Sequence, residues 1–381
     1  MTIKTDYDLI IVGASFAGLI AARTAAYRGL KTAIIDAKKE PGARVRTTGI
    51  LVKEAVEEID IPSALTRKIP GARLYAPNGR HLDLYAPGYY FLATDTPAMM
   101  RWLAQEAARA GVDLLFGTRF QDADYVGNSV ALHRLGLTCK YLIGADGAKS
   151  NVANAFGLGK NTDFLVGLEA EFAPNNSVNP DLLHCFVDSR LAPGYLGWVV
   201  PGVHTTQVGV AVSNHFFGQS RKPDFQSFYN HTHRLFNFAE PPHLERRSGL
   251  IPCGGLVSSF YQPRVMLIGD AAGMVSPLTA GGIRFAFQYG RRAGQLVADY
   301  LLADGGDPGE IIAKELPKLG MKKWMRRAWS IAPPNQLLNL GLFTPPMRAL
   351  AQWIYFQKRG MSANLDRTSP PLNGISVDEC S

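Results

Sequence analysis

Short apolar runs and amphipathic segments alternate along most of the chain, a pattern typical of helices packed against a mostly parallel sheet. Apolar runs that predict buried strands occupy residues 7–12, 31–35, 141–143 and 265–268. A helix is predicted from Thr94 to Gly111, because Met99, Leu103 and Ala107 recur on one of its faces. Together these elements predict an α/β fold whose core sheet is assembled from segments far apart in the sequence.

The strand patterns of the middle region are different, since they are short and separated by turns of Pro, Asn and Gly. They cover residues 165–172, 184–187, 198–200 and 207–212. Closely spaced strands of this kind predict an antiparallel sheet inserted into the first domain.

The first strand ends in a glycine turn that opens an Ala-rich helix. Gly13 would make the tight turn and Gly18 would let helix and strand pack closely, so that the helix N-terminus faces a pyrophosphate. Ser15 replaces the middle glycine of this Rossmann-like fingerprint with a small residue that the turn can accept. The second strand leads to Asp36, where a carboxylate can accept hydrogen bonds from ribose hydroxyls. The remaining predicted contacts of this motif are Phe16, Ala17 and Ala37.

A second glycine-rich turn follows the strand at 265–268 and opens a long helix. Asp270, at the exit of the strand, can accept hydrogen bonds from the ribityl hydroxyls of a flavin. The paired glycines before the helix let backbone N–H groups approach the anionic O2/N1 edge of a reduced isoalloxazine. The alternative is a glycine-rich turn with a purely structural role. The predicted flavin contacts of this motif are Gly269, Asp270, Pro277, Gly281, Gly282 and Ile283.

A third strand–turn–helix motif lies between these two, with Asp146 and Gly147 at the turn and Ser150 at the helix N-cap. The order of the three motifs resembles the flavoprotein fold shared by aromatic hydroxylases, flavin-dependent halogenases and geranylgeranyl reductases, over about the first 300 residues. The stretch 269–273 with the loop at 277–283 is most similar to the geranylgeranyl reductase branch. The resemblance implies that Asp146 and Gly147 also contact FAD.

The predicted fold is therefore α/β, with a Rossmann-like FAD-binding domain, an inserted antiparallel-sheet substrate domain and a C-terminal helical arm. The FAD-binding domain is discontinuous and takes residues 1–60, 90–160 and 250–305. The other predicted units are a substrate-binding domain at 61–89 and 161–249, a helical segment at 306–365 and a flexible tail at 366–381.

The resemblance also implies which residues lie beside the flavin. Arg46, Thr48 and Gly49 stand where the geranylgeranyl reductase branch carries a basic residue, a cysteine and glycines, so that Thr48 replaces the cysteine. Tyr195 and Trp198 match part of an aromatic signature of the same branch, with the tyrosine one place early. Trp198 is expected to shape a hydrophobic tunnel over the flavin, and the alternative is that it closes the sheet of the substrate domain. We take Trp198, Tyr195 and Thr48 as the candidate catalytic residues.

The function that the resemblance implies is FAD-dependent reduction of C=C bonds of an isoprenoid or other hydrophobic substrate, by hydride from reduced flavin and protonation of the neighbouring carbon. One alternative is an FAD-dependent monooxygenase or halogenase of the same fold. Another is an electron-transfer flavoprotein that serves a membrane carrier. Because there is no second glycine fingerprint, the reductant is expected to be NAD(P)H docking transiently, or a ferredoxin attracted by the positive charge.

Length and composition agree with this interpretation. The chain has 381 residues, which predicts about two domains, and a formal net charge of +8. It has no run of eighteen apolar residues, and the first strand begins too early to leave room for a signal peptide. Four widely spaced cysteines suit a cytoplasmic protein with free thiols, and burial is expected for Cys139, Cys185 and Cys253. No metal site is expected, because His231, His233 and His243 lack further ligands at a defined spacing.

The positive charge is concentrated near the C-terminus, where Lys and Arg interleave with Trp and Met between Lys314 and Arg327. Apolar stretches follow at 337–343 and 347–356. A basic segment with large apolar residues can lie in an anionic membrane interface. The alternative is a helical arm that packs on its own fold or on a second subunit. Nucleic-acid binding is not expected, since no recognition module accompanies the charge.

Overall fold

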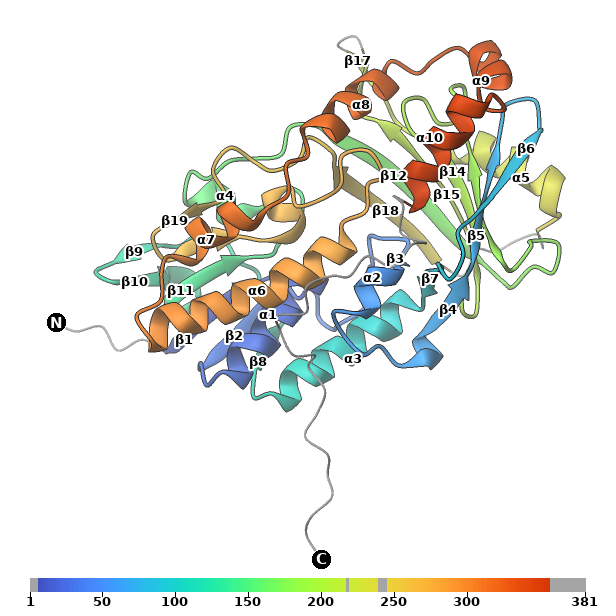
Figure 1. Ribbon diagram of the computed structural model, residues 1–381. Coiled ribbons are helices and arrows are strands. Elements are labelled where there is room, and N and C mark those ends of the chain that lie inside the picture. Colours follow the sequence, from blue (N-terminus) through green and yellow to red (C-terminus); the bar gives the residue numbers. More distant parts are fainter. Residues whose placement is uncertain (1–5, 217–218, 239–244, 357–381) are drawn as a thin grey trace, which may run out of the picture.

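The computed structural model describes residues 6–216, 219–238 and 245–356 (Figure 1). An eight-stranded sheet has the order β19-β20-β11-β1-β2-β8, and the β9–β10 hairpin is attached to β11. The neighbours from β20 to β8 are all parallel. The strands are β1 (Tyr7–Val12), β2 (Thr32–Asp36), β8 (Asp113–Phe116), β9 (Asp124–Val126), β10 (Ser129–Leu132), β11 (Leu137–Gly144), β19 (Tyr261–Gln262) and β20 (Val265–Leu267). The four predicted core strands are thus confirmed.

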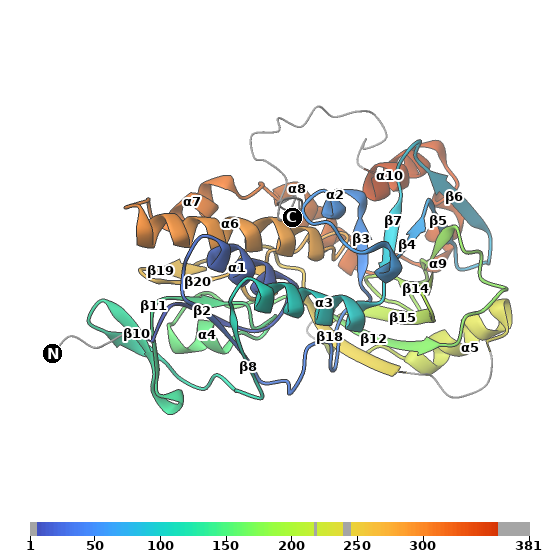
Figure 2. The same cartoon turned by 90° about the horizontal axis from the view of Figure 1, so that it is seen from below.

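Helices cover this sheet, and α1 packs between α6 and α3 (Figure 2). The approach of α1 and α6 is close: a Cβ on Gly290 would lie 2.7 Å from the Ala17 carbonyl oxygen, and one on Gly294 would lie 2.4 Å from the Ala21 carbonyl oxygen. Glycine is therefore required at both positions of α6. The helices of this part are α1 (Phe16–Tyr27), α2 (Lys53–Val56), α3 (Thr96–Arg109), α4 (Asn151–Ala155), α6 (Ile283–Leu302) and α7 (Pro308–Glu315).

A seven-stranded sheet forms the second layer, in the order β18-β12-β15-β14-β13-β5-β6. It is antiparallel except for the pairing of β13 with β5, which is parallel. One face is packed by α5, whose Phe228 ring lies where a Cβ on Gly197 would be. Its elements are β5 (Gly71–Tyr75), β6 (His81–Tyr85), β12 (Phe164–Phe172), β13 (Leu182–Phe186), β14 (Gly197–Pro201), β15 (Thr206–Ser213), β18 (Glu245–Pro252) and α5 (Phe225–Phe236).

A small sheet, β3-β7-β4, connects the two layers. Its strands are β3 (Ile50–Val52), β4 (Thr66–Ile69) and β7 (Phe91–Thr94), and a separate hairpin pairs β16 (His215–Phe216) with β17 (Gln219–Ser220). The domain boundaries stay a prediction. The tail at 366–381 and the end of the predicted helical segment, after residue 356, lie outside the described residues.

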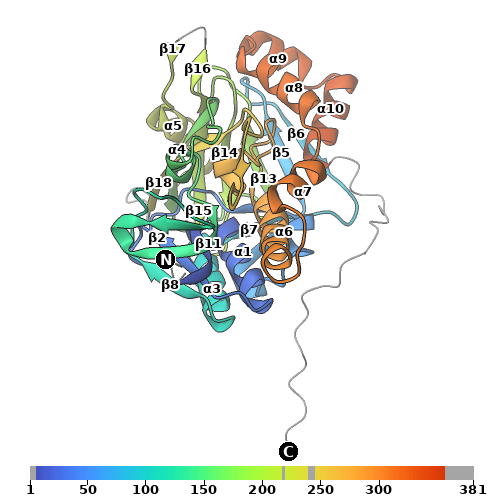
Figure 3. The same ribbon diagram turned by 90° about the vertical axis from the view of Figure 1, so that its left-hand side faces the viewer.

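The C-terminal arm consists of α8 (Gly320–Ser330), α9 (Asn335–Gly341) and α10 (Pro345–Phe356). Figure 3 shows it beside β5 and β6, and Leu342, Ala351 and Phe356 of the arm are buried in a cluster with strand residues such as Leu84. The arm therefore packs on its own fold, as one of the two alternatives predicted. None of the helices in the described part of the chain is both long and apolar enough to span a bilayer. Cys139, Cys185 and Cys253 are buried and free, as expected.

Candidate active site

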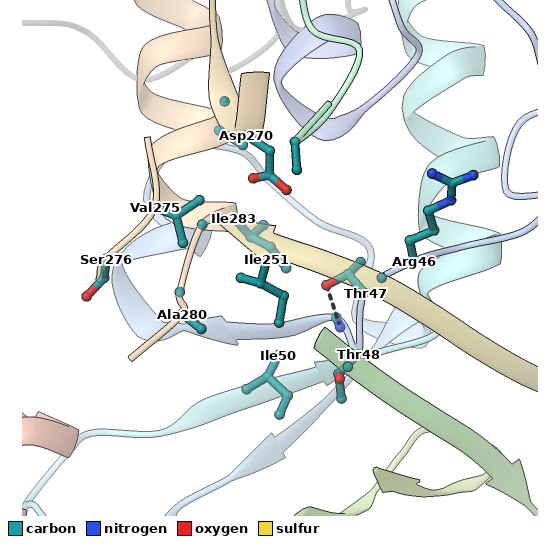
Figure 4. A pocket seen from close by; sticks show the side chains of 18 of the residues that line it. Arg46, Thr47, Thr48, Ile50, Ile251, Asp270, Val275, Ser276, Ala280 and Ile283 are labelled. Carbon is teal, nitrogen blue, oxygen red and sulfur yellow. Dashed lines mark hydrogen bonds between the residues drawn. The ribbon is translucent and has the colours of Figure 1, made fainter. Parts of the chain in front are cut away.

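A large cavity of about 1630 Å³ lies where the carboxyl ends of β1, β2 and β11 meet the seven-stranded sheet and the C-terminal arm. Ligand pockets usually measure about 300–1,000 Å³. This volume is large enough for a dinucleotide cofactor and a second ligand. Figure 4 shows part of it, with Asp270 and the loop of Arg46, Thr47 and Thr48 around the apolar side chains of Ile251 and Ile283.

The turn after β1 is shaped by backbone requirements. Gly13 has φ +106°, and a Cβ there would lie 2.4 Å from the Ala145 carbonyl oxygen. Ser15 is the N-cap of α1 and its hydroxyl accepts a hydrogen bond from the Gly18 amide at 3.2 Å. Asp36 accepts from the Ala14 amide at 2.7 Å, so its carboxylate is held beside the turn. The helix N-terminus and this carboxylate are arranged as a dinucleotide site requires.

The second motif places a free carboxylate in the cavity. Asp270 lies in a short 3-10 helix, Gly269–Ala272, and is open to the cavity. Within the described residues no hydrogen bond reaches its carboxylate, and the surrounding protein raises its pKa to about 6 by desolvation. The N-terminus of α6 begins beside it, and Gly282, its N-cap, supplies no side-chain cap. The cavity therefore offers an acceptor for hydroxyl groups next to uncapped backbone N–H groups.

The two carboxyl oxygens of Asp146, in the third motif, have different surroundings. Its Oδ2 accepts hydrogen bonds from the amides of Asn151 at 2.6 Å and Val152 at 3.2 Å, which helps to begin α4. Ser150 is the N-cap of that helix, as predicted. The other oxygen of Asp146, Oδ1, is buried without a protein partner, and burial raises the pKa of this carboxyl group. An unpartnered acceptor at the cavity wall leaves room for a ligand donor.

Most of the residues predicted from the sequence lie at this one cavity. Gly18 and Pro277 do not line it, although Gly18 has a packing role, since a Cβ there would lie 2.1 Å from the Gly13 carbonyl oxygen. The predicted residues that do line it are Gly13, Ser15, Phe16, Ala17, Asp36, Ala37, Arg46, Thr48, Gly49, Asp146, Gly147, Tyr195, Trp198, Gly269, Asp270, Gly281, Gly282 and Ile283.

The loop that carries Thr48 lies against the seven-stranded sheet. The Thr48 hydroxyl donates a hydrogen bond to Glu169 Oε2 at 2.6 Å, and the Thr48 carbonyl oxygen accepts one from Gln207 at 3.1 Å. Gly49 follows with φ +78°, where a Cβ would lie 1.9 Å from the Thr96 hydroxyl oxygen. These contacts fix Thr48 between the sheet and the cavity.

The two aromatic candidates also join parts of the site. Trp198 lies across Gly209 of the neighbouring strand, and its indole N–H donates to Glu169 Oε2 at 2.7 Å. Trp198 thus covers part of the sheet and also lines the cavity, while its place over the flavin stays a prediction. The Tyr195 hydroxyl donates to the Thr279 carbonyl oxygen at 2.8 Å, which connects the segment before β14 to the loop before α6.

A buried group of charges at the cavity wall was not predicted from the sequence. Arg247 Nη2 lies 2.7 Å from Glu171 Oε1 and 2.9 Å from Glu245 Oε2, and Nη1 lies 3.4 Å from Glu169 Oε1. The signal that could have revealed it is the alternation of Glu169 and Glu171 with apolar residues in the predicted strand at 165–172, which places both on one face of the sheet.

The comparisons with known proteins agree with the geometry. The model of the family described as "FAD binding domain" matches residues 6–307. A digeranylgeranylglycerophospholipid reductase of Methanothrix thermoacetophila is 30% identical over 322 residues, which cover 79% of this chain and 80% of that protein. The chain belongs to the FAD-binding geranylgeranyl reductase family. A geranylgeranyl diphosphate reductase of Rhodobacter capsulatus is 28% identical over 329 residues, covering 83% of this chain and 80% of that protein.

Solved structures confirm the fold of this family member. A geranylgeranyl bacteriochlorophyll reductase-like protein of Thermoplasma acidophilum superposes with a TM-score of 0.77 at 23% identity, over 88% of this chain and 90% of that one. A halogenase in complex with phloroglucinol and FAD gives a TM-score of 0.67 at 13% identity, over 88% and 79% of the two chains.

This geranylgeranyl reductase family protein is an FAD-dependent oxidoreductase, and its residues fit the cofactor. The α1 turn with Asp36 would hold the pyrophosphate and the adenosine ribose, while Asp270 and the α6 N-terminus would hold the ribityl chain and the flavin ring. When bound, FAD supplies two-electron transfer that the side chains cannot perform. Within the described ranges 6–216, 219–238 and 245–356, no three His, Cys, Asp or Glu side chains are grouped as metal ligands. His243 lies outside these ranges.

Proposed function

We propose that this protein reduces C=C bonds of an isoprenoid chain, with the geranylgeranyl group as its substrate class. The observation that carries the proposal is the apolar extension of the cavity beyond the cofactor motifs. There the wall is formed by strand residues such as Leu74 and Val200, and by Leu342, Ile354 and Tyr355 of the arm. A chamber of this composition suits a long hydrocarbon chain. The two related reductases are named for different substrates, a digeranylgeranylglycerophospholipid and geranylgeranyl diphosphate, and both names contain the geranylgeranyl group.

The side chains beside the cofactor have positioning roles in this proposal. Trp198, fixed by its hydrogen bond to Glu169, would hold an alkene against the flavin and keep water away. Tyr195 would keep the sheet at a constant distance from the loop before α6, because its hydroxyl bonds to that loop. The reductant is proposed to be NAD(P)H or a ferredoxin.

The main alternative is oxygen chemistry, since halogenases share the fold. The experiment that separates the two starts from enzyme whose FAD has been reduced with dithionite. Mixed anaerobically with a geranylgeranyl lipid, the reductase should return its flavin to the oxidised form and yield a product two mass units heavier for each bond reduced. If flavin reoxidation requires oxygen for every isoprenoid offered, and the product gains oxygen or halogen, the reductase proposal is wrong.

The surface of the arm supports a proposal for where the enzyme works. Of the large apolar side chains that are exposed among the described residues, six belong to the arm, including Trp324 at 70% and Leu340 at 75% exposure. Arg327 and Arg348 are exposed on the same arm, and Lys318 is exposed just before it. We propose that this surface rests on an anionic membrane, where each basic residue contributes roughly 1 kcal/mol.

Arg326 lies within the basic stretch that the sequence predicts for this surface, but its side chain is buried. Arg326 is 3% exposed, and its guanidinium donates hydrogen bonds inward to the Gly194 carbonyl oxygen and to the Ser330 hydroxyl at 3.2 Å. Its expected place on the basic face was therefore wrong, because α8 turns this side chain toward the fold.

Flotation with vesicles that contain anionic lipid tests the membrane proposal. Wild-type protein should float at low salt and be released at high salt, since the contribution of the charges is screened. Leu340→Asp should weaken flotation, whereas Leu302→Asp, at a similarly exposed position at the end of α6, should not. If wild-type protein does not bind such vesicles at low salt, the membrane proposal is wrong and the arm only packs on the fold.

A further inference from the structure

Glu169 is a buried carboxyl group at the wall of the cavity. It is 5% exposed and comes from the middle of β12. One oxygen, Oε2, accepts the Trp198 indole N–H at 2.7 Å and lies 2.6 Å from the Thr48 hydroxyl. An indole N–H can only donate, whereas a proton between a carboxyl group and a hydroxyl can lie on either oxygen. The contact with Thr48 is therefore a route along which a proton can pass.

The positive charge beside Glu169 is shared with two other carboxyl groups. Among the described residues, Arg247 is the cation that faces Glu169, and its guanidinium is closer to Glu171, at 2.7 Å, and to Glu245, at 2.9 Å, than to Glu169, at 3.4 Å. The single positive charge of Arg247 is thus shared among three carboxyl groups, and its distance to Glu169 is the longest of the three. The strand between β12 and β14 is β15, and it contributes no charge beside Glu169. Its Gly209 lies opposite Glu169, and its Gln207 lies opposite Glu171.

Burial is the main influence that favours the neutral form of Glu169. Burial raises the pKa of Glu169, and the negative charge of Glu171 adds to the effect. The hydrogen bonds from Thr48 and Trp198 and the charge of Arg247 oppose it. A carboxyl group with a raised pKa that is also hydrogen-bonded toward a ligand cavity has the properties of a general acid.

We propose that Glu169, acting through the Thr48 hydroxyl, is the proton donor for saturation of the substrate alkene. This inference rests on the proposed function. When bound, reduced FAD would supply the hydride for one alkene carbon. The Thr48 hydroxyl gives its proton to the other carbon, forming the second C–H bond, and takes up the proton of Glu169 as the Glu169 O–H bond breaks.

The products of this transfer are stabilised by groups already in place. The new carboxylate of Glu169 keeps the Trp198 N–H and the Thr48 O–H as donors and has Arg247 beside it. A proton from solvent then restores Glu169 before the next cycle. Trp198 is in this scheme a positioning residue for the donor as well as a wall of the cavity.

The first test does not depend on turnover. The infrared difference spectrum of wild type minus Glu169→Gln at pH 7 should contain the C=O band of a protonated carboxyl group, shifted in D₂O. Other carboxyl groups cancel in the difference. Absence of the band from the Glu169 difference overturns the proposal.

The second test follows anaerobic flavin reoxidation by a geranylgeranyl lipid, in variants first shown to retain FAD. Glu169→Gln and Thr48→Val should slow this step by about 10²- to 10⁴-fold, the usual contribution of general acid catalysis. Thr48→Ser keeps the hydroxyl and should remain within a few-fold of wild type. In wild type the rate should fall as pH rises through the pKa of Glu169, and Glu169→Gln should lack this limb.

The outcomes separate the inference from the function beneath it. If wild type reacts with the lipid and Glu169→Gln or Thr48→Val matches its rate and pH profile, the donor assignment is wrong while the reductase proposal stands. If wild type itself fails to react with any isoprenoid, the proposed function fails and the donor role fails with it, whatever the infrared result.

Discussion

Replacement of Asp270 by alanine should weaken FAD binding without disturbing the fold. The carboxylate opens into the cavity and accepts no hydrogen bond from the described part of the protein, so its removal leaves no protein donor unpaired. Hydrogen bonds to a charged group contribute about 1.5–3 kcal/mol. At about 1.4 kcal/mol per decade, the loss corresponds to a Kd one to two decades higher.

Fluorescence titration of apoprotein with FAD measures this effect. Asp307→Ala is a matched control, because Asp307 caps α7, where it accepts from the Gly309 amide at 2.9 Å. The control should lose about 0.5–2 kcal/mol of stability and keep its FAD affinity. An unchanged Kd in Asp270→Ala would remove this residue from the cofactor site and refute the assignment of the second motif.

The same site predicts a pH dependence. In the apoprotein the pKa of Asp270 is raised to about 6, so this group favours the folded apoprotein at low pH, and that contribution is lost as pH rises through 6. Donor hydroxyls of the cofactor favour the ionised form instead. FAD affinity should therefore rise between pH 5 and pH 7, approaching tenfold per unit below pH 6. Asp270→Asn should show no such dependence, and an equally steep profile in this variant would contradict the reasoning.

The remaining predictions concern the turn, the charge group and the aromatic wall. Gly13→Ala should lower the thermal midpoint and FAD retention more than Gly29→Ala, since both have positive φ but only Gly13 has a backbone oxygen within 2.4 Å of the new Cβ; equal losses would contradict this. Arg247→Met should cost about 3–5 kcal/mol in urea unfolding at neutral pH, because buried carboxylates lose their partner, and less at pH 5. Trp198→Ala should slow substrate-dependent flavin reoxidation while FAD stays bound, and an unchanged rate would exclude its role beside the substrate.

The sequence by itself determined the cofactor fold, because its requirements are local. A strand, a turn that only glycine can make and a following helix lie within about a dozen residues, as around Gly13, so the pattern is visible without tertiary contacts. The same holds for the turn before α6 and for the buried strands, whose apolar runs were each confirmed. Asp36 and Asp270 could be predicted to lie at the cavity, which both of them line, because the motif fixes their positions relative to these strands.

The tertiary structure decided which side chains meet in the site. Thr48 and Glu169 are 121 residues apart in sequence, and only the packing of the Thr48 loop against β12 brings them within hydrogen-bond distance. Periodicity could place Glu169 on a strand face but could not show that this face lines the cavity. The burial of Arg326 was equally out of reach, because a helix with charges on several sides does not reveal which side the fold will cover. Contacts between distant segments depend on how whole layers pack, and no local pattern encodes them.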